Sequence, residues 1–136
     1  MSNIPVAVVT GSSKGTGFAI VQGLCKQFSG DVYLTSRDTK QGKTAVAKLQ
    51  EEKLKPLFHQ LDISDLQSIQ NLRDFLKEKY GGLNVLVNNA GIITKGKEPH
   101  DPTSMGIQAE VTLRTNFFAT RDVCTEMLPL LKPNVI

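Results

Sequence analysis

Three glycines near the start of the chain have the spacing of a turn that could hold a phosphate group. The segment runs Thr10-Gly-Ser-Ser-Lys-Gly-Thr-Gly17, after an apolar, β-branched run at residues 6–9 and before a helical pattern. Lacking a Cβ, Gly11 can form a left-handed turn, Gly15 can approach an anion and Gly17 can bring helix and strand together. The free N–H groups of the first helical turn, with the helix dipole, then favour a dinucleotide pyrophosphate.

This spacing differs from two commoner phosphate-binding patterns. It is not G-x-G-x-x-G, and no Gly-Lys-Ser/Thr follows four residues after a glycine, as a Walker loop would require. A plain strand-to-helix turn without a ligand is therefore an open alternative for this motif taken alone.

Two cations accompany the turn. About 20 positions beyond it, where an acid would favour NAD by accepting from the ribose 2′-hydroxyl, the chain has Ser36 followed by Arg37. Together with Lys14, Arg37 could converge on a 2′-phosphate, which favours NADP(H). Either residue alone is as well explained by a surface ion pair or by solvent. Asp38 precedes a helical segment with Gln41 three residues on, which predicts an N-cap rather than an NAD-selecting acid.

A second motif, Asn88-Asn89-Ala90-Gly91, follows an apolar run at residues 85–87. On its own it would usually be a turn. Here it comes after four alternations of strand and helix patterns, at the carboxyl end of a strand beyond the switch in strand order, where ligands bind in open α/β sheets. The asparagine amides could bridge neighbouring strands, and the small residues leave room for a flat ring.

The whole pattern predicts an α/β fold, a Rossmann-like, doubly wound parallel sheet truncated to about four strands in the order 3-2-1-4 with flanking helices. The expected strands are residues 6–9, 32–34, 56–61 and 85–87, with a fifth beginning at 135–136. We expect one NADP(H)-binding domain over residues 1–136, incomplete at its carboxyl end. An unpaired edge on the fourth strand would then lower stability or promote self-association.

Composition narrows the function classes. The 136 residues carry a net charge of +3, and the charges alternate along expected helices, so nucleic-acid binding is not indicated. There is no membrane-length apolar run and no basic leader, which predicts a cytoplasmic protein without a membrane anchor. Cys25 and Cys124 are expected to be reduced, helix-buried thiols, and the isolated His59 and His100 suggest no metal site.

The chain from residue 6 to residue 136 resembles the amino-terminal half of short-chain dehydrogenases/reductases, and within them the animal NADPH-dependent carbonyl reductases. The likeness rests on a specific set of motifs. These are Thr10-Gly-Ser-Ser-Lys-Gly-Thr-Gly17, Phe28-Ser-Gly-Asp-Val32, Leu34-Thr-Ser-Arg-Asp38, Phe58-His-Gln-Leu-Asp-Ile63, Val87-Asn-Asn-Ala-Gly-Ile92 and Thr115-Asn-Phe-Phe-Ala-Thr-Arg-Asp-Val-Cys124.

The resemblance implies a set of residues that would bind NADPH. It places Gly11, Lys14, Gly15 and Gly17 along the pyrophosphate and ribose, Arg37 at the 2′-phosphate, Asp62 and Ile63 beside the adenine, and Asn89, Ala90 and Gly91 facing the nicotinamide-side ribose.

The resemblance also implies catalytic and substrate residues. Asn116 matches the asparagine of the family's catalytic tetrad, which is thought to hold a proton-relaying water. Read without the family, Asn116 would simply satisfy a local carbonyl in its helix. Lys95 and Gln108 lie where carbonyl reductases approach their substrates, including glutathione adducts.

The implied reaction transfers a hydride from NADPH to a ketone, aldehyde or quinone carbonyl, with a tyrosine as proton donor and a serine on the developing alkoxide. It requires a Tyr-x-x-x-Lys, but Tyr33 and Tyr80 are followed four residues later by Arg37 and Asn84. The last serine, Ser104, comes well before the fifth strand. We therefore expect NADPH binding without turnover from this stretch alone. Two alternatives are a noncatalytic NADP(H)-binding module or inactive truncated isoform, and a scaffold with no ligand.

Overall fold

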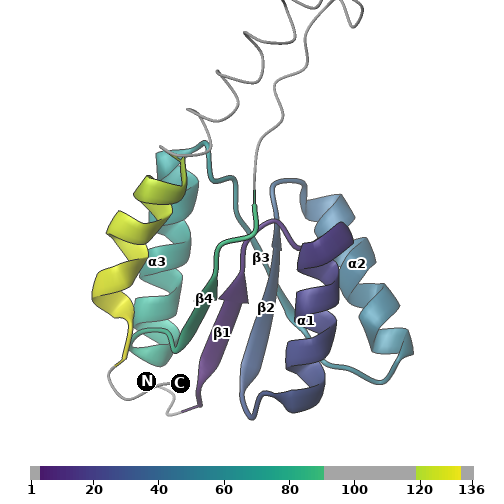
Figure 1. The fold of residues 1–136 in the computed structure, drawn as a ribbon. Helices are drawn as coiled ribbons and strands as arrows, with labels where there is room; N and C mark the ends of the chain where they lie inside the picture. The colour runs from purple at the N-terminus through teal and green to yellow at the C-terminus, as the bar shows by residue number, and fades with distance from the viewer. Residues whose placement is uncertain (1–3, 91–118, 133–136) are drawn as a thin grey trace, which may run out of the picture.

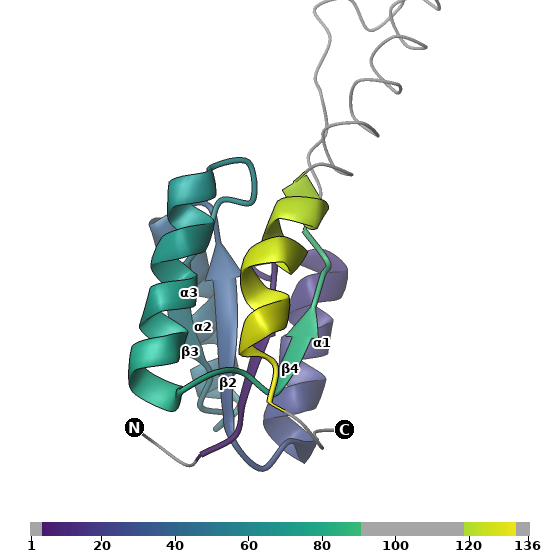
Figure 2. The ribbon, with the colours of Figure 1, turned by 90° about the vertical axis from the view of Figure 1, so that its left-hand side faces the viewer.

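The computed structural model describes residues 4–90 and 119–132. Within them, four strands form one parallel sheet in the order β3-β2-β1-β4, with helices against both faces (Figures 1 and 2). This confirms the predicted fold class and strand order. In sequence the elements are β1 (Val6–Val9), α1 (Gly15–Gln27), β2 (Asp31–Ser36), α2 (Thr39–Glu51), β3 (Leu57–Gln60), α3 (Leu66–Tyr80), β4 (Val85–Val87), a helix over residues 119–127 and the short 3-10 helix η1 (Leu128–Leu130).

Strand β1 is an inner strand of the sheet, paired with β2 on one side and β4 on the other. At its carboxyl end Val9 is in register with Leu34 and with Val87. All three pairings in the sheet are parallel, so the carboxyl ends of the four strands meet along one edge. The glycine turn, Arg37 and the segment after β4 all leave the sheet at that edge.

The alternating side chains of β1 divide the core into two layers. Val6 and Val8 pack toward α3 and the helix over residues 119–127, whereas Ala7 and Val9 pack toward α1 and α2. Figures 1 and 2 show these two pairs of helices on opposite faces of the sheet. Every β1 side chain is buried, as expected for the inner strand of a sheet covered on both faces.

The start of α2 is capped as the sequence predicts, whereas the start of α3 differs from the prediction in its cap and in the exposure of its first residue. Asp38 caps α2 as predicted, its Oδ1 accepting from the backbone N–H groups of Lys40 and Gln41 at 2.8 and 3.2 Å. The sequence Ser64-Asp-Leu-Gln67 predicts a capping box at the start of α3, but in the structure the N-cap is Asp65, whose side chain accepts from the N–H of Gln67. Helical spacing with Ile69 and Leu72 predicts that Leu66 is buried, but this first residue of α3 is 49% exposed.

Strand and cysteine details differ slightly from expectation. The third strand covers Leu57–Gln60, one residue shorter at each end than predicted. Both cysteines are free but only half-buried, and burial raises the pKa of the Cys25 thiol. A proline interrupts helical hydrogen bonding, so Pro129 predicts a bend or an end of the helix near it. The helix over residues 119–127 does give way to η1 at Leu128.

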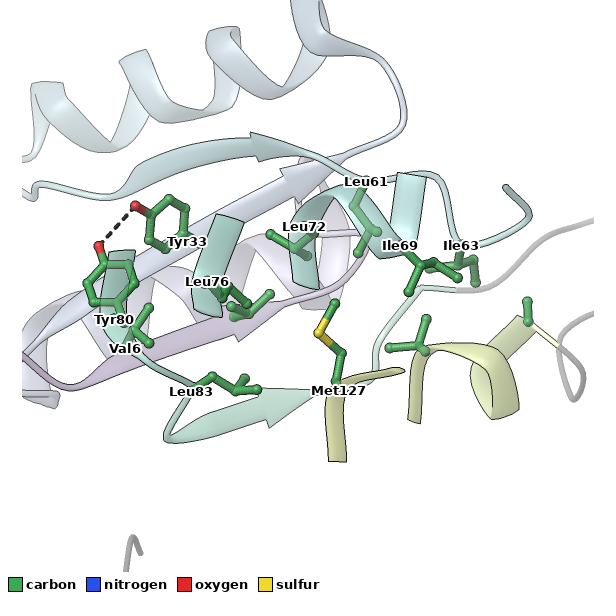
Figure 3. Close-up of a cluster of buried hydrophobic side chains, with 13 residues drawn as sticks. Val6, Tyr33, Leu61, Ile63, Ile69, Leu72, Leu76, Tyr80, Leu83 and Met127 are labelled. Atoms are coloured by element: carbon green, nitrogen blue, oxygen red, sulfur yellow. Dashed lines mark hydrogen bonds between the residues drawn. The ribbon is translucent and has the colours of Figure 1, made fainter. Parts of the chain in front are cut away.

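A buried polar pair lies in the layer under α3 (Figure 3). The hydroxyl oxygens of Tyr33 and Tyr80 are 2.9 Å apart, and Tyr80 donates to Asp31 Oδ2 at 2.6 Å. Both rings are 2% exposed. Burial, together with the hydrogen bond to Asp31, raises the pKa of Tyr80 well above its usual range. This pair ties α3 to the amino-terminal end of β2, away from the edge where the glycine turn lies.

The segment over residues 119–132 contacts both α3 and the chain just before β4. Leu131 forms an isolated parallel bridge with Leu83, through hydrogen bonds from Leu83 N to Leu130 O at 3.0 Å and from Lys132 N to Leu83 O at 2.9 Å. An ion pair joins Arg73 of α3 to Glu126. The fifth strand predicted at residues 135–136 lies outside the described residues.

Candidate cofactor-binding site

The glycine turn has the left-handed backbone that its sequence predicts. Gly11 has a φ of +57° and Gly15 a φ of +65°. A Cβ on Gly11 would lie 2.7 Å from the Cα of Ala90, so the absent side chain lets the segment after β4 pass directly over the turn. A Cβ on Gly15 would meet nothing within 4 Å. The turn is therefore closed on its Ala90 side and open at Gly15.

Gly17 is required by a contact that differs from the predicted one. A Cβ there would lie 2.5 Å from Asn89 Nδ2 and 2.6 Å from the carbonyl oxygen of Gly11. The Asn89 amide occupies this space because it donates to that same Gly11 carbonyl at 2.9 Å. Helix α1 thus lies close to the turn with the Asn89 side chain held between them, which realises the predicted bridging role of an asparagine amide.

Thr10 helps to form this site through hydrogen bonds that the sequence did not predict. Its Oγ1 accepts from the backbone N–H groups of Asn89 and Ala90, both at 2.9 Å, and its own N–H donates to Val87 O at 3.0 Å. Thr10 is 2% exposed. Its position directly after an apolar strand was the available signal, because a buried hydroxyl there needs partners.

A second missed pair joins the ends of β1 and β2. Ser12, fully buried, accepts from the N–H of Thr35 at 2.9 Å and donates to Val9 O at 2.9 Å. Thr35 Oγ1 donates to the same Val9 carbonyl at 2.8 Å. These hydrogen bonds fix the start of the glycine turn against the last residues of β2.

The amino terminus of α1 is suited to an anion. Lys14 is its N-cap residue, with an extended backbone (φ −159°, ψ 168°) and no side-chain cap, and the first turn carries no acidic residue. The N–H groups there are thus not occupied by a capping side chain or opposed by a carboxylate. Together with the open space at Gly15, this fits the pyrophosphate of a dinucleotide.

The two residues that are expected to contact the 2′-phosphate lie at the surface. Lys14 and Arg37 are exposed, and neither takes part in an ion pair with the other residues that the structure describes. The backbone of Arg37 is nevertheless anchored, because its carbonyl accepts from Gln60 Nε2 at 3.2 Å. The nearby Asp38 carboxylate is engaged in capping α2, so it is not presented as a free acid.

Asp62 and Ile63 follow β3 at the same sheet edge. Asp62 Oδ1 accepts from the N–H and the hydroxyl of Ser64, at 2.9 and 2.5 Å, and the Asp62 N–H donates to Ser68 Oγ at 2.9 Å. Ile63 is 7% exposed and packs in the core layer under α3. Its contact with an adenine stays a prediction.

Four predicted site residues, Gly91, Lys95, Gln108 and Asn116, lie outside the described residues. Among the residues that are described, hydrogen bonds and close packing bring together Thr10, Gly11, Gly17, Asn89 and Ala90. The same part of the chain holds no group of three or more His, Cys, Asp or Glu that could ligate a metal. Nor, across residues 4–90 and 119–132, is any helix long and apolar enough to cross a bilayer.

A doubly wound parallel sheet with a glycine turn after its first strand is typical of dinucleotide-binding proteins, and comparison with known families supports this class. Residues 5–135 match the family model described as short chain dehydrogenase. The chain belongs to the short-chain dehydrogenase family.

Curated relatives narrow the likeness to one group. The chain is 65% identical over 132 residues to carbonyl reductase (NADPH) 1 of Homo sapiens, covering 97% of this chain and 47% of the human protein. It is 64% identical over 129 residues to carbonyl reductase (NADPH) 3 of Mus musculus, covering 95% of this chain and 46% of the mouse protein. The chain thus spans about half the length of the curated relatives it matches.

Solved structures share the fold. Menthone neomenthol reductase from Mentha piperita superposes with a TM-score of 0.78 at 29% identity, over 98% of this chain and 58% of that one. Salutaridine reductase from Papaver somniferum gives a TM-score of 0.77 at 31% identity, over 93% of this chain and 53% of that one. A Pseudomonas aeruginosa RhlG/NADP active-site complex gives a TM-score of 0.73 at 26% identity, over 96% of this chain and 51% of that one.

Proposed function

We propose that this chain provides the NADP(H)-binding part of an NADPH-dependent carbonyl reductase that reduces ketones, aldehydes or quinones. The observation that carries the proposal is the closed glycine turn, in which Asn89 and Ala90 are held over Gly11 while Gly15 stays open. A turn without a ligand would need neither the open position nor the uncapped amino terminus of α1. The 62–65% identity to carbonyl reductases whose names specify NADPH supports the choice of cofactor.

In the proposed complex the chain's own residues bind and orient. The N–H groups at the start of α1 would hold the pyrophosphate, and Lys14 with Arg37 would neutralise the 2′-phosphate. Asp62 and Ile63 would flank the adenine. When bound, NADPH would supply the hydride.

The remaining site residues are proposed on family likeness alone. Asn116 would hold a proton-relaying water, Gly91 would lie by the nicotinamide-side ribose, and Lys95 with Gln108 would contact substrates that include glutathione adducts. The proposed location is the cytoplasm. Self-association through the sheet edge stays a prediction.

The sequence contains no Tyr-x-x-x-Lys, so we expect residues 1–136 to bind NADPH without reducing a carbonyl. The second candidate, a noncatalytic NADP(H)-binding module, shares this expectation for the purified chain. The two separate when the chain is compared with a longer version that carries a Tyr-x-x-x-Lys: only a carbonyl reductase gains turnover.

The experiment is a titration of the purified chain with NADPH, followed by nucleotide fluorescence, and then an assay of NADPH oxidation with a quinone and a ketone. Micromolar binding without oxidation is the expected result. A folded sample that binds no dinucleotide would exclude the proposal, and turnover by residues 1–136 would overturn the assignment of the proton donor.

A further inference from the structure

One hydroxyl couples the glycine turn to the end of β2. Ser12 is 0% exposed, and its Oγ has three backbone neighbours: the N–H of Thr35 at 2.9 Å, Val9 O at 2.9 Å and Thr35 O at 3.3 Å. The Ser12 N–H also donates to Thr35 O at 2.9 Å. A hydroxyl has one proton and two lone pairs, so Ser12 can accept from Thr35 and donate to Val9 at the same time.

Thr35 completes a closed set of hydrogen bonds. It too is 0% exposed, and its Oγ1 donates to Val9 O at 2.8 Å. The Val9 carbonyl therefore receives both side-chain hydroxyls at the point where β1 ends. These two buried hydroxyls, one in the turn after β1 and one in β2, both have hydrogen-bond partners and form a rigid connection. An aliphatic pair would leave the Thr35 N–H without an acceptor.

The two ends of this connection carry the two charged parts of the proposed cofactor site. Ser12 directly follows Gly11, in the turn proposed for the pyrophosphate, and Thr35 lies two residues before Arg37. Two residues of extended chain span about 7 Å, so Arg37 has little freedom beyond its own side chain. On its other side the Arg37 carbonyl is held by Gln60.

We propose that Ser12 and Thr35 are positioning residues that set the distance between the pyrophosphate turn and Arg37, and so determine the preference for NADPH over NADH. The inference rests on the proposed function. NADPH would engage both places at once, whereas NADH, which lacks the 2′-phosphate, would engage only the turn. Loosening the connection between them therefore penalises NADPH more than NADH.

The test measures the dissociation constants of NADPH and NADH for the purified chain and three variants. Ser12→Ala and Thr35→Val each remove a hydroxyl, and Thr35→Ser retains it. We expect the first two to raise the NADPH constant about fivefold, as loss of one buried hydrogen bond predicts, with the NADH constant changed less than about twofold. Thr35→Ser should keep the wild-type ratio of the two constants.

Tyr80→Phe is the matched control, because it deletes a buried hydroxyl that bonds to the opposite end of β2. It should lower the melting temperature without changing the ratio of NADPH to NADH constants. If Ser12→Ala fails to fold, the pair Thr35→Val and Thr35→Ser decides the question alone.

Two failures are distinguishable. If the wild-type chain is folded but binds neither dinucleotide, the proposed function itself is wrong. Suppose instead that the wild-type chain binds NADPH, and that the hydroxyl-free variants raise the dissociation constants of NADPH and NADH by the same factor or change neither constant. The positioning role is then wrong, and the proposed function is unaffected.

Discussion

The side-chain amide of Asn89 donates a 2.9 Å hydrogen bond to the carbonyl oxygen of Gly11, and so joins the segment after β4 to the turn after β1. The glycine turn is thus not a local structure of the first strand and helix. Its shape depends on a residue that is distant in sequence, and Thr10 strengthens the link by accepting from the backbone of the same segment.

Replacing Asn89 should therefore damage both stability and binding. Asn89→Ala leaves the Gly11 carbonyl without its donor, and we expect the free energy of unfolding to fall by about 1–2 kcal/mol and NADPH affinity to fall several-fold. Urea denaturation and fluorescence titration measure the two effects. Asn71→Ala is the control, because Asn71 is an exposed residue of α3 whose side chain accepts from Gln67 in the same helix. Equal effects from both variants would contradict the proposed role.

Two glycines of α1 should respond in opposite ways to alanine. Gly17→Ala places a Cβ within 2.6 Å of both the Asn89 amide and the Gly11 carbonyl, so the turn must distort and NADPH binding should be lost. Gly23→Ala meets nothing within 4 Å and should stabilise the helix by up to about 1 kcal/mol. Thermal unfolding and titration of both variants check this. Unchanged binding in Gly17→Ala would be inconsistent with the described turn.

Arg37 should matter for NADPH alone. Arg37→Gln removes the charge proposed to meet the 2′-phosphate, and we expect NADPH affinity to fall roughly 10- to 100-fold while NADH affinity stays the same. The loss should shrink at high salt, since the residue is exposed. Lys48→Gln, which removes an exposed lysine from the far end of α2, controls for net charge. Parallel losses for NADPH and NADH would exclude a 2′-phosphate contact.

The Tyr80 hydroxyl should make stability depend on alkaline pH. Because the pKa of Tyr80 is raised in the folded protein, the folded state retains a proton that the unfolded state releases above about pH 10. Its contribution to stability is fully present below that pH and declines as pH rises, by up to about 1.4 kcal/mol per pH unit. Urea denaturation between pH 8 and pH 11 measures the slope. Tyr80→Phe should be less stable at pH 8 and show a shallower decline; an equally steep decline would assign the effect to other groups.

The strand positions and the glycine turn could be predicted from sequence because they depend on local patterns, and the strand order follows from the doubly wound arrangement expected of alternating strands and helices. β-branched runs that alternate with amphipathic stripes specify the sheet, and the spacing of Gly11, Gly15 and Gly17 specifies a turn whose positive φ only glycine adopts readily. Asp38 was predictable as a cap for the same reason, since its partners are two and three residues away.

The polar contacts that fasten the site could not be predicted in this way. Ser12 contacts Thr35, and Thr10 contacts Asn89, across strands whose register no local pattern fixes. Gly17 was correctly expected to be small, but the neighbour that requires it, the Asn89 amide, comes from the segment after β4, which is adjacent in the sheet and distant in sequence. Leu66 was wrongly expected to be buried, because helical periodicity gives the face on which a residue lies but not how far the core that covers that face extends.

Leu131 lies beside Leu83 as a parallel partner at the outer side of β4. Bringing such distant residues together is the step that loses chain entropy, and it is already complete in this structure. Any strand that extends this ladder, from the same polypeptide or another, would start from a first pair that is already formed. Each further pair would then form next to the previous one without the entropy loss of a new loop closure.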